Sequence, residues 1–278
     1  MKKIILAIIA VTLIMSSYSQ ETDTTRFKLG KKEILIVDDE VVSVEKTDSE
    51  SDSITDDEED GDECDSDKGF EGHWAGLDLG LNTFLNNENT MDLPSDAEFL
   101  ELNTGKSWGV GVNFFEKGIN LYKGHIGIVT GLGFEINNYR FDKNITLNPD
   151  SSYITYVTDT ILDFQKNKLT ATYLNLPVIL EFKIPVGRKD KSIHFAAGVL
   201  GGIKLGSHTK QVYEDNNRRH KDKVREDFHL SPFRYGLTAR VGYSGLNLFA
   251  TYHMSTLFEE NEGPELYPFT VGIAFCGI

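Results

Sequence analysis

Cysteine and long apolar runs are both scarce in this sequence. It contains only two cysteines, Cys64 and Cys276, among 278 residues. A disulfide-rich scaffold is therefore excluded, while a Cys64–Cys276 bond and two free thiols both stay open. Beyond the first residues, no stretch approaches the roughly 18 consecutive apolar residues of a membrane-spanning helix. This leaves a soluble domain or a β-barrel, in which alternation hides the hydrophobicity.

A surplus of positive charge is also lacking. The formal net charge is −15, from 43 acidic and 28 basic residues. Residues 38–71 hold 17 of the acids and two of the bases, so they carry the whole surplus and the rest of the chain is balanced. Nucleic-acid binding has no support in this composition. Because a like-charged, Ser/Asp-rich tract repels itself and buries little, we predict a disordered acidic linker at residues 46–71.

The beginning of the chain has the pattern of a secretory signal peptide. Lys2 and Lys3 precede an apolar run of about 12 residues, and small residues follow up to Ser19, which predicts a signal peptide at residues 1–19. Residues 20–45 contain two β-prone runs around an acidic turn. We expect a short periplasmic leader there, and because a lone hairpin is marginal in water it needs a partner.

The remainder, residues 72–278, predicts an all-β domain, an eight-stranded antiparallel up-and-down transmembrane β-barrel. Long and short links alternate between its apolar/polar runs, as in outer-membrane barrels with short periplasmic turns and longer external loops. The even number of strands places both termini in the periplasm. We expect the strands at residues 72–83, 107–116, 125–141, 169–184, 192–205, 232–243, 246–256 and 267–276.

Alternation within each run assigns two faces. One set is large and apolar and suits lipid, whereas the other is rich in Gly, Asn, Thr and single charges and suits a narrow lumen. A soluble ligand-binding barrel would place the bulky face inward. Aromatic residues near strand ends suggest interfacial girdles: Trp108, Tyr139, Phe233, Tyr235, Tyr243, Tyr252, Tyr267 and Phe269.

Charges of both signs fall on the inward face. Unpaired charges in a narrow lumen would be costly, so we predict an ion-pair network that closes it rather than an open pore. Its members are Asp78, Glu135, Glu181, Lys183, Lys204, Arg234 and Arg240.

Catalytic, cofactor and metal sites find little support. His125, His194 and His253 share the inward parity, and Ser255 lies two residues after His253. Together with Glu135 or Glu181 these residues could form a Ser-His-Glu triad. A lipid hydrolase must present its nucleophile toward lipid, however, and alternation places Ser255 on the inward face. The histidine spacings match no metal motif. We therefore expect no catalytic residue, no cofactor and no metal.

The predicted external loop at residues 206–231 contains a basic cluster. Bidentate arginine suits phosphate, so contacts with lipopolysaccharide are one hypothesis, and a solvated loop is the other, because acidic residues lie beside the basic ones. The possible outer-loop anion contacts are Arg218, Arg219, Lys221, Lys223 and Arg225.

Several passages together resemble the outer-membrane β-barrel domain family common in Bacteroidota, of the PorT-like kind. They are residues 72–82 (GHWAGLDLGLN), 130–134 (TGLGF), 173–177 (YLNLP), 197–199 (AGV) and 271–275 (VGIAF). The resemblance covers the region after Gly72 and implies an integral outer-membrane barrel without catalytic residues. The chain departs from many such barrels by ending on Cys-Gly-Ile instead of a terminal aromatic residue.

The leading functional hypothesis is a non-enzymatic barrel in the outer membrane. It acts as an anchor, a scaffold or an accessory component of an envelope complex, and residues 21–71 contact a periplasmic or outer-membrane protein partner. A small passive channel, a lipid-modifying enzyme and a soluble ligand-binding barrel are the alternatives.

Overall fold

The structure is a computed structural model that describes residues 24–29, 32–37, 40–46, 70–186, 192–216 and 218–276. The chain divides into two compact units, Met1–Cys64 and Asp65–Ile278, which are described separately. The predicted signal peptide and residues 47–69 of the predicted acidic linker lie outside the described residues. No helix among the described residues is long and apolar enough to cross a membrane.

The first unit contains a small antiparallel sheet. Its strands are β1 (Thr24–Leu29), β2 (Lys32–Val37) and β3 (Glu40–Lys46), with β2 in the centre. The two β-prone runs of the sequence fall on β2 and β3, which pair through Ile34 and Val44. Sequence reasoning missed β1, because only Phe27 and Leu29 are apolar in it. The third strand supplies part of the pairing that an isolated hairpin lacks.

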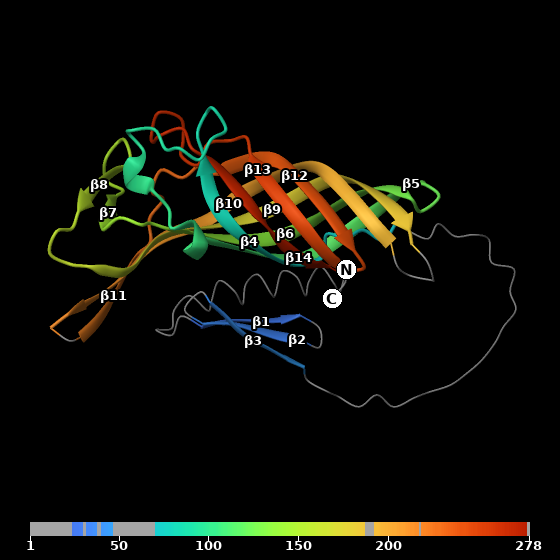
Figure 1. Cartoon of the computed structure of the whole chain (residues 1–278), viewed down its shortest axis with the longest axis horizontal. Coiled ribbons are helices and arrows are strands. Elements are labelled where there is room, and N and C mark those ends of the chain that lie inside the picture. Colours follow the sequence, from blue (N-terminus) through green and yellow to red (C-terminus); the bar gives the residue numbers. More distant parts are fainter. Residues whose placement is uncertain are drawn as a thin grey trace, which may run out of the picture. The chain divides into compact units, whose positions relative to one another are not determined.

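The second unit is a closed barrel (Figure 1). Within the described residues, eight strands form a ring in which each is antiparallel to its neighbours, and β10 pairs with β9 to close it. This confirms the predicted eight-stranded barrel. In chain order the strands are β4 (Gly76–Leu85), β5 (Trp108–Tyr122), β6 (Ile126–Arg140), β9 (Phe164–Pro185), β10 (Ser192–Asp215), β12 (Phe233–Tyr243), β13 (Leu246–His253) and β14 (Tyr267–Cys276).

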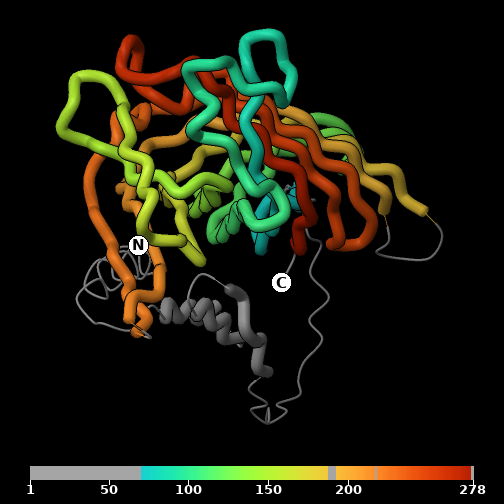
Figure 2. Tube along the Cα trace, turned by 60° about the vertical axis from the view of Figure 1, so that its left-hand side comes forward, coloured from blue at the N-terminus to red at the C-terminus, as the bar shows by residue number. Residues whose placement is uncertain are grey.

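The long connections carry structure of their own. They contain the short helices η2 (Glu98–Leu100) and η3 (Thr104–Lys106) and the hairpin of β7 (Ile145–Asn148) with β8 (Thr155–Thr158). The predicted link 117–124 is mostly strand, because β5 continues to Tyr122 and turns at Lys123–Gly124 with positive φ angles of 43° and 72°. The long connections gather at the opposite end of the ring from these turns (Figure 2).

The prediction of a loop at 206–231 was wrong for residues 206–215 and 218–224, which are strands. β10 continues to Asp215 and returns as β11 (Arg218–Val224), an antiparallel neighbour. The residues of β11 are almost all charged, so the sequence showed no apolar face there. The continued β10 is nevertheless paired on its other side with the first residues of β9, which sequence periodicity alone does not reveal.

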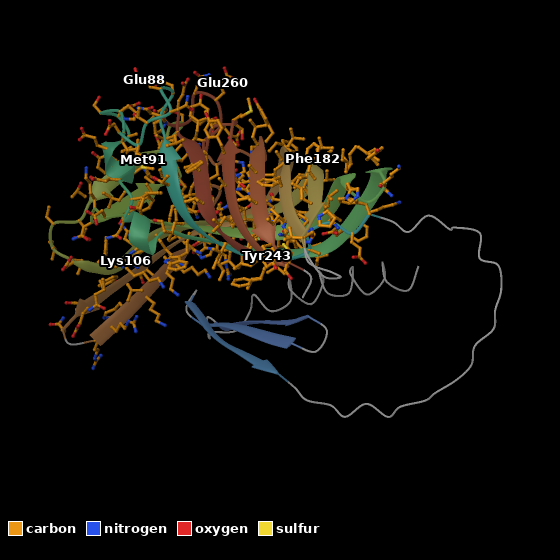
Figure 3. All side chains as sticks on the ribbon, turned by 45° about the vertical axis from the view of Figure 1, so that its right-hand side comes forward. Glu88, Met91, Lys106, Phe182, Tyr243 and Glu260 are labelled. Carbon is orange, nitrogen blue, oxygen red and sulfur yellow. The ribbon has the colours of Figure 1, made fainter. Side chains whose placement is uncertain are left out.

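The two faces of the barrel follow the predicted alternation. Along β9, Leu176, Val178, Leu180 and Phe182 are exposed, whereas Asn175, Ile179 and Glu181 are buried. Figure 3 shows the outer side chains, Phe182 and Tyr243 among them. Trp108, Phe233, Tyr235 and Tyr243 are exposed as expected for girdles. Tyr139 was wrongly included, because its odd position on β6 turns it inward against Phe84, with ring centroids 4.8 Å apart.

Candidate functional site

The middle of the lumen is crossed by two ion pairs. In the first, Arg240 Nη2 lies 2.5 Å from Asp78 Oδ2, and Asn113 Nδ2 donates to the same oxygen at 3.0 Å. The guanidinium carbon of Arg240 lies 4.4 Å from the ring centre of Trp74. Gly111 leaves room for this pair, since an added Cβ would come within 3.1 Å of Asp78 Cβ. The buried guanidinium is thus neutralised by a carboxylate and covered by an aromatic ring.

The second ion pair joins β6 to β12. Arg234 Nη2 lies 2.6 Å from Glu135 Oε2 and donates to Asn175 Oδ1 at 3.1 Å, while Asn175 donates to Glu135. Asn137 Nδ2 donates to the other oxygen of Glu135 at 2.8 Å. The guanidinium of Arg234 stacks 3.7 Å from the centre of the Tyr173 ring. These contacts link three strands, β6, β9 and β12, through one connected polar network.

The other three predicted network residues have different partners. Glu181 contacts His73, with Oε1 to Nδ1 at 2.6 Å, and not Lys183. Lys183 Nζ lies 4.5 Å from the centre of the Phe70 ring. Lys204 pairs with Asp227 and with the carbonyl of Leu230 at the loop end of the barrel. Parity placed these side chains on a face, but their partners come from segments outside the strands.

Residues 70–75 lie inside the barrel at the end with the tight turns, and we name them the lumen plug. Their backbone N–H groups donate to carboxylates of the barrel wall: that of His73 to Glu181 Oε2 at 3.0 Å, and those of Trp74 and Ala75 to Glu116 Oε2 at 2.7 and 2.8 Å. Such charge-assisted bonds are among the stronger hydrogen bonds in proteins. The plug is therefore fastened through its main chain.

Glycines of the wall make room for the plug. Phe70 and Trp74 are buried, with 5% and 3% of their surface exposed. A Cβ added to Gly127 would lie 2.4 Å from the Phe70 ring, and one added to Gly131 would lie 2.8 Å from the Trp74 ring. The buried thiol of Cys276 donates to the carbonyl of His73 at 3.0 Å and is free in the structure. Cys64 lies outside the described residues.

Sequence reasoning had assigned part of the plug to the first strand and had not identified Glu116. The reason is a β-bulge between Asn113 and Phe115, where the register of β5 against β6 shifts. A bulge inserts one residue, so the inward face changes from odd to even positions and receives Glu116 and Gly118. Small residues at Gly118, Gly127 and Gly131 were the only sequence signal that the wall leaves space here.

The loop end of the barrel is filled by an apolar cluster that we name the loop cap. It joins inward residues of the wall, such as Tyr139 and Leu169, to residues of all the long connections. Ser231 supports it by donating to the carbonyl of Phe258 at 2.8 Å. The buried residues contributed by the connections are Ala97, Phe99, Leu100, Phe141, Ile145, Leu147, Ile154, Phe228, Leu230, Leu257, Phe258 and Leu266.

A small cavity lies between the plug and the cap. It has a volume of about 20 Å³ and is lined by Trp74, Asp78, Asn113, Glu135 and Arg240, among others. Such a volume holds about one water molecule. From the plug through the ion pairs to the cap, protein atoms occupy the lumen.

The drafted triad is not assembled. Ser255 Oγ accepts the backbone N–H of Tyr235 at 3.1 Å, and within the described residues the ring nitrogens of His253 have no hydrogen-bond partner. His194 stacks on His73 with ring centroids 3.7 Å apart. The expectation that His125 points inward was wrong, since it is exposed in the turn before β6. No group of three or more His, Cys, Asp or Glu residues suited to a metal ion occurs in the described part of the chain.

The predicted basic cluster lies on and just after β11 instead of in a loop. Arg218, Arg219, Lys221 and Lys223 are exposed strand residues, and Arg225 is exposed directly after the strand. Alternation along β11 places Arg219, Lys221 and Lys223 on one face and Arg218 on the other. The structure therefore brings only part of the cluster together.

A closed antiparallel ring with an apolar outer face and a polar, filled interior defines an integral outer-membrane β-barrel. Residues 67–256 match the family described as outer membrane protein beta-barrel domain, and the chain belongs to this family. A search of the curated proteins finds no match.

Proposed function

We propose that this protein is a non-conducting, non-enzymatic component of the outer membrane that anchors or scaffolds an envelope complex. The observation that supports the proposal is the filled lumen, in which the plug, the two ion pairs and the loop cap follow one another. A barrel closed in this way offers its ends and its attached segments for contact, not a passage. The hydrogen bond of Ser255 to the backbone of Tyr235 also argues against a lipid-modifying enzyme.

We further propose an orientation and a contact surface. The tight turns face the periplasm, as in other outer-membrane barrels, and the plug then leads the preceding chain into that compartment. Residues 1–19 act as the signal peptide, and the acidic residues that precede the plug form a periplasmic arm that binds a protein partner. The PorT-like kinship of Bacteroidota is part of the same proposal and predicts no catalytic residue.

The purified full-length protein should give no stepwise current in planar lipid bilayers. The reason is that Arg240 and Trp74 meet across the lumen and the remaining cavity holds about one water molecule. A trimeric porin prepared in the same detergent serves as the positive control. Reproducible unitary conductance of the full-length chain would overturn the proposal and support the passive channel.

The arm hypothesis is tested by affinity purification of the tagged protein from outer membranes in mild detergent. We expect a protein partner in near-equal amount, which is lost when residues 21–69 are deleted, a deletion that spares the plug. The matched control replaces the same residues by a flexible Gly/Ser tract of equal length, which keeps the number of residues but removes the charge. Recovery of the barrel alone, or retention of the partner by both variants, contradicts a role of the arm in binding.

A further inference from the structure

One edge of strand β5 is open at the end of the barrel with the tight turns (Figure 1). β4 begins at Gly76, which is opposite Asn113, while β5 continues to Tyr122. The residues before Gly76 form the lumen plug and lie inside the barrel instead of continuing the ladder. Among the described residues, this part of β5 therefore pairs with β6 alone. We name the stretch Phe114–Tyr122 the open edge.

The main chain of the open edge has unused hydrogen-bonding groups. The N–H of Lys183 on β9 donates to the carbonyl of His125 at 2.7 Å, which shows that odd positions of β6 face β9. The even positions of β6 therefore bond to β5, opposite Lys117 and Ile119. Alternate residues of the open edge point their N–H and C=O groups away from β6, where no backbone partner lies within the described residues. These residues are Glu116, Gly118 and Asn120.

The surroundings of the open edge favour an added strand. The outward side chains Phe115, Ile119 and Leu121 are 49%, 49% and 53% exposed, so apolar surface extends along the edge. Open sheet edges do not occur in contact with the hydrocarbon of a membrane, because no water satisfies their backbone groups there. In water, a long apolar edge strand is a ready template for another strand. Either environment makes pairing of this edge favourable.

A second copy of the chain does not fit the open edge. Two identical edges pair antiparallel around a two-fold axis perpendicular to the sheet. That axis would turn one barrel upside down relative to the other, whereas both copies must sit in the membrane with their tight turns on the same side. A strand of different sequence is therefore required.

The open edge specifies the chemistry of that strand. Its exposed outward side chains are apolar except for Lys117, so the partner needs apolar residues at alternate positions and an acidic residue opposite Lys117. Inward space is limited, because a Cβ added to Gly118 would clash with the carbonyl oxygen of Phe70 and the carboxylate of Glu116 is bonded to the plug. The inward positions of the partner thus suit small or polar residues.

We propose that the open edge binds an extended segment of another envelope protein, which adds to the sheet as a strand from the periplasmic side. The segment spans about nine residues, the length of the edge, and places an acidic residue opposite Lys117. The proposal rests on the proposed function and deepens it, since it names where the barrel meets its complex. It does not involve the acidic arm.

The test places the photocrosslinking amino acid benzoylphenylalanine at Phe115 or at Leu121 of the full-length protein in outer membranes. We expect both positions to crosslink one envelope protein, at two sites in a single segment that are spaced as Phe115 and Leu121 are, because an added strand has the same rise per residue. The segment should show the alternation described above. Crosslinks to lipid alone, to unrelated proteins, to a second copy or to residues 21–69 of the same chain would each overturn the proposal.

Two pairs of variants test the hydrogen bonds and the charge of the open edge. Asn120→Pro removes a backbone N–H that faces away from β6, and Asn120→Ala is its control, because both lose the side-chain bond to the N–H of Gly124. Lys117→Glu reverses the charge on the edge, and Lys123→Glu makes the same change in the turn beyond it. We expect the first variant of each pair to lower the crosslink yield at Phe115 roughly 10-fold and its control less than twofold. Equal yields within either pair would contradict the proposal.

Deletion of residues 21–69 separates this proposal from the one for the arm. The deletion leaves the open edge intact, so the crosslink at Phe115 should persist. Loss of the crosslink would assign the binding to the arm and overturn the proposal for the edge. If the crosslink persists while no protein co-purifies through the arm, the arm hypothesis fails and the open edge remains the contact, so the two proposals fail separately.

Discussion

The variant Asp78→Asn is expected to lower the free energy of unfolding by about 3 kcal/mol, because it leaves the buried guanidinium of Arg240 without a counter-charge. Arg240 is 5% exposed, and its Nη1 and Nη2 both donate to this carboxylate. The substitution keeps the size of the side chain, so it tests the charge and creates no cavity. Urea unfolding in lipid vesicles, followed by the gel mobility of the folded barrel, measures the change.

Two further variants separate the ion pair from a general effect of substitution. Glu88→Gln removes an exposed carboxylate of a long connection and should change stability by less than about 0.5 kcal/mol. The double variant Asp78→Asn/Arg240→Met should cost less than the sum of the single variants by about 1 kcal/mol or more, since it leaves no buried charge. Additive losses, or a loss for Asp78→Asn as small as that for Glu88→Gln, would show that the pair does not hold the lumen together.

Replacing both carboxylates that fasten the plug, in Glu116→Ala/Glu181→Ala, is expected to release residues 70–75 from the wall. The backbone N–H groups of His73, Trp74 and Ala75 lose charged acceptors at 2.7 to 3.0 Å. Loss of such a hydrogen bond should raise the equilibrium constant for release of the plug from the wall roughly 10- to 100-fold. Hydrogen exchange of these amides should accelerate by that factor.

Trp74 gives a second readout of plug release. The chain has two tryptophans, and Trp74 is 3% exposed whereas Trp108 is 48% exposed. In a Trp108→Phe background, the emission of Trp74 should shift to longer wavelength and its quenching by acrylamide should increase. The matched control is Glu71→Ala, which removes the exposed carboxylate of a plug residue and leaves Glu116 and Glu181 in place.

Strand β6, which lies between the strands that carry Glu116 and Glu181, offers an independent route to the same state. Gly127→Ala adds a Cβ at 2.4 Å from the Phe70 ring and leaves the carboxylates intact. It should expose Trp74 in the same way. If neither Glu116→Ala/Glu181→Ala nor Gly127→Ala changes the exchange or the quenching, the plug is held by something other than the contacts of the wall.

Much of the barrel could be predicted from the sequence because strands have a side-chain period of two and lipid accepts only apolar surfaces. The runs containing Leu77, Ile128, Val178 and Ile273 each identified a strand and its outer face. The alternation rule failed where the strand is irregular or has no apolar face. After the bulge at Asn113 the inner and outer positions of β5 exchange, and the β10–β11 hairpin lacks the alternation of apolar and polar residues that marks the barrel wall.

The candidate site was only partly visible for a related reason. Parity placed Asp78, Glu135, Arg234 and Arg240 in the lumen, and the structure pairs them. The alternation of residues along a strand could not reveal that Glu181 contacts His73, which lies 108 positions earlier in the chain. Nor could it reveal that Lys204 pairs with Asp227, which lies in the connection after β11. The pairing of inward charges depends on which segments re-enter the lumen, and no local pattern records that.

The sequence by itself determined the closed ring of strands, its lipid-facing surface and its polar interior, because each follows from local alternation and from the chemistry of the membrane. Only the tertiary structure decided how the ring is sealed. The plug at residues 70–75 and the loop cap bring together residues that are distant in sequence, through a bulge and the packing of connections. These are properties of neighbours in space, and a period along the chain carries no information about them.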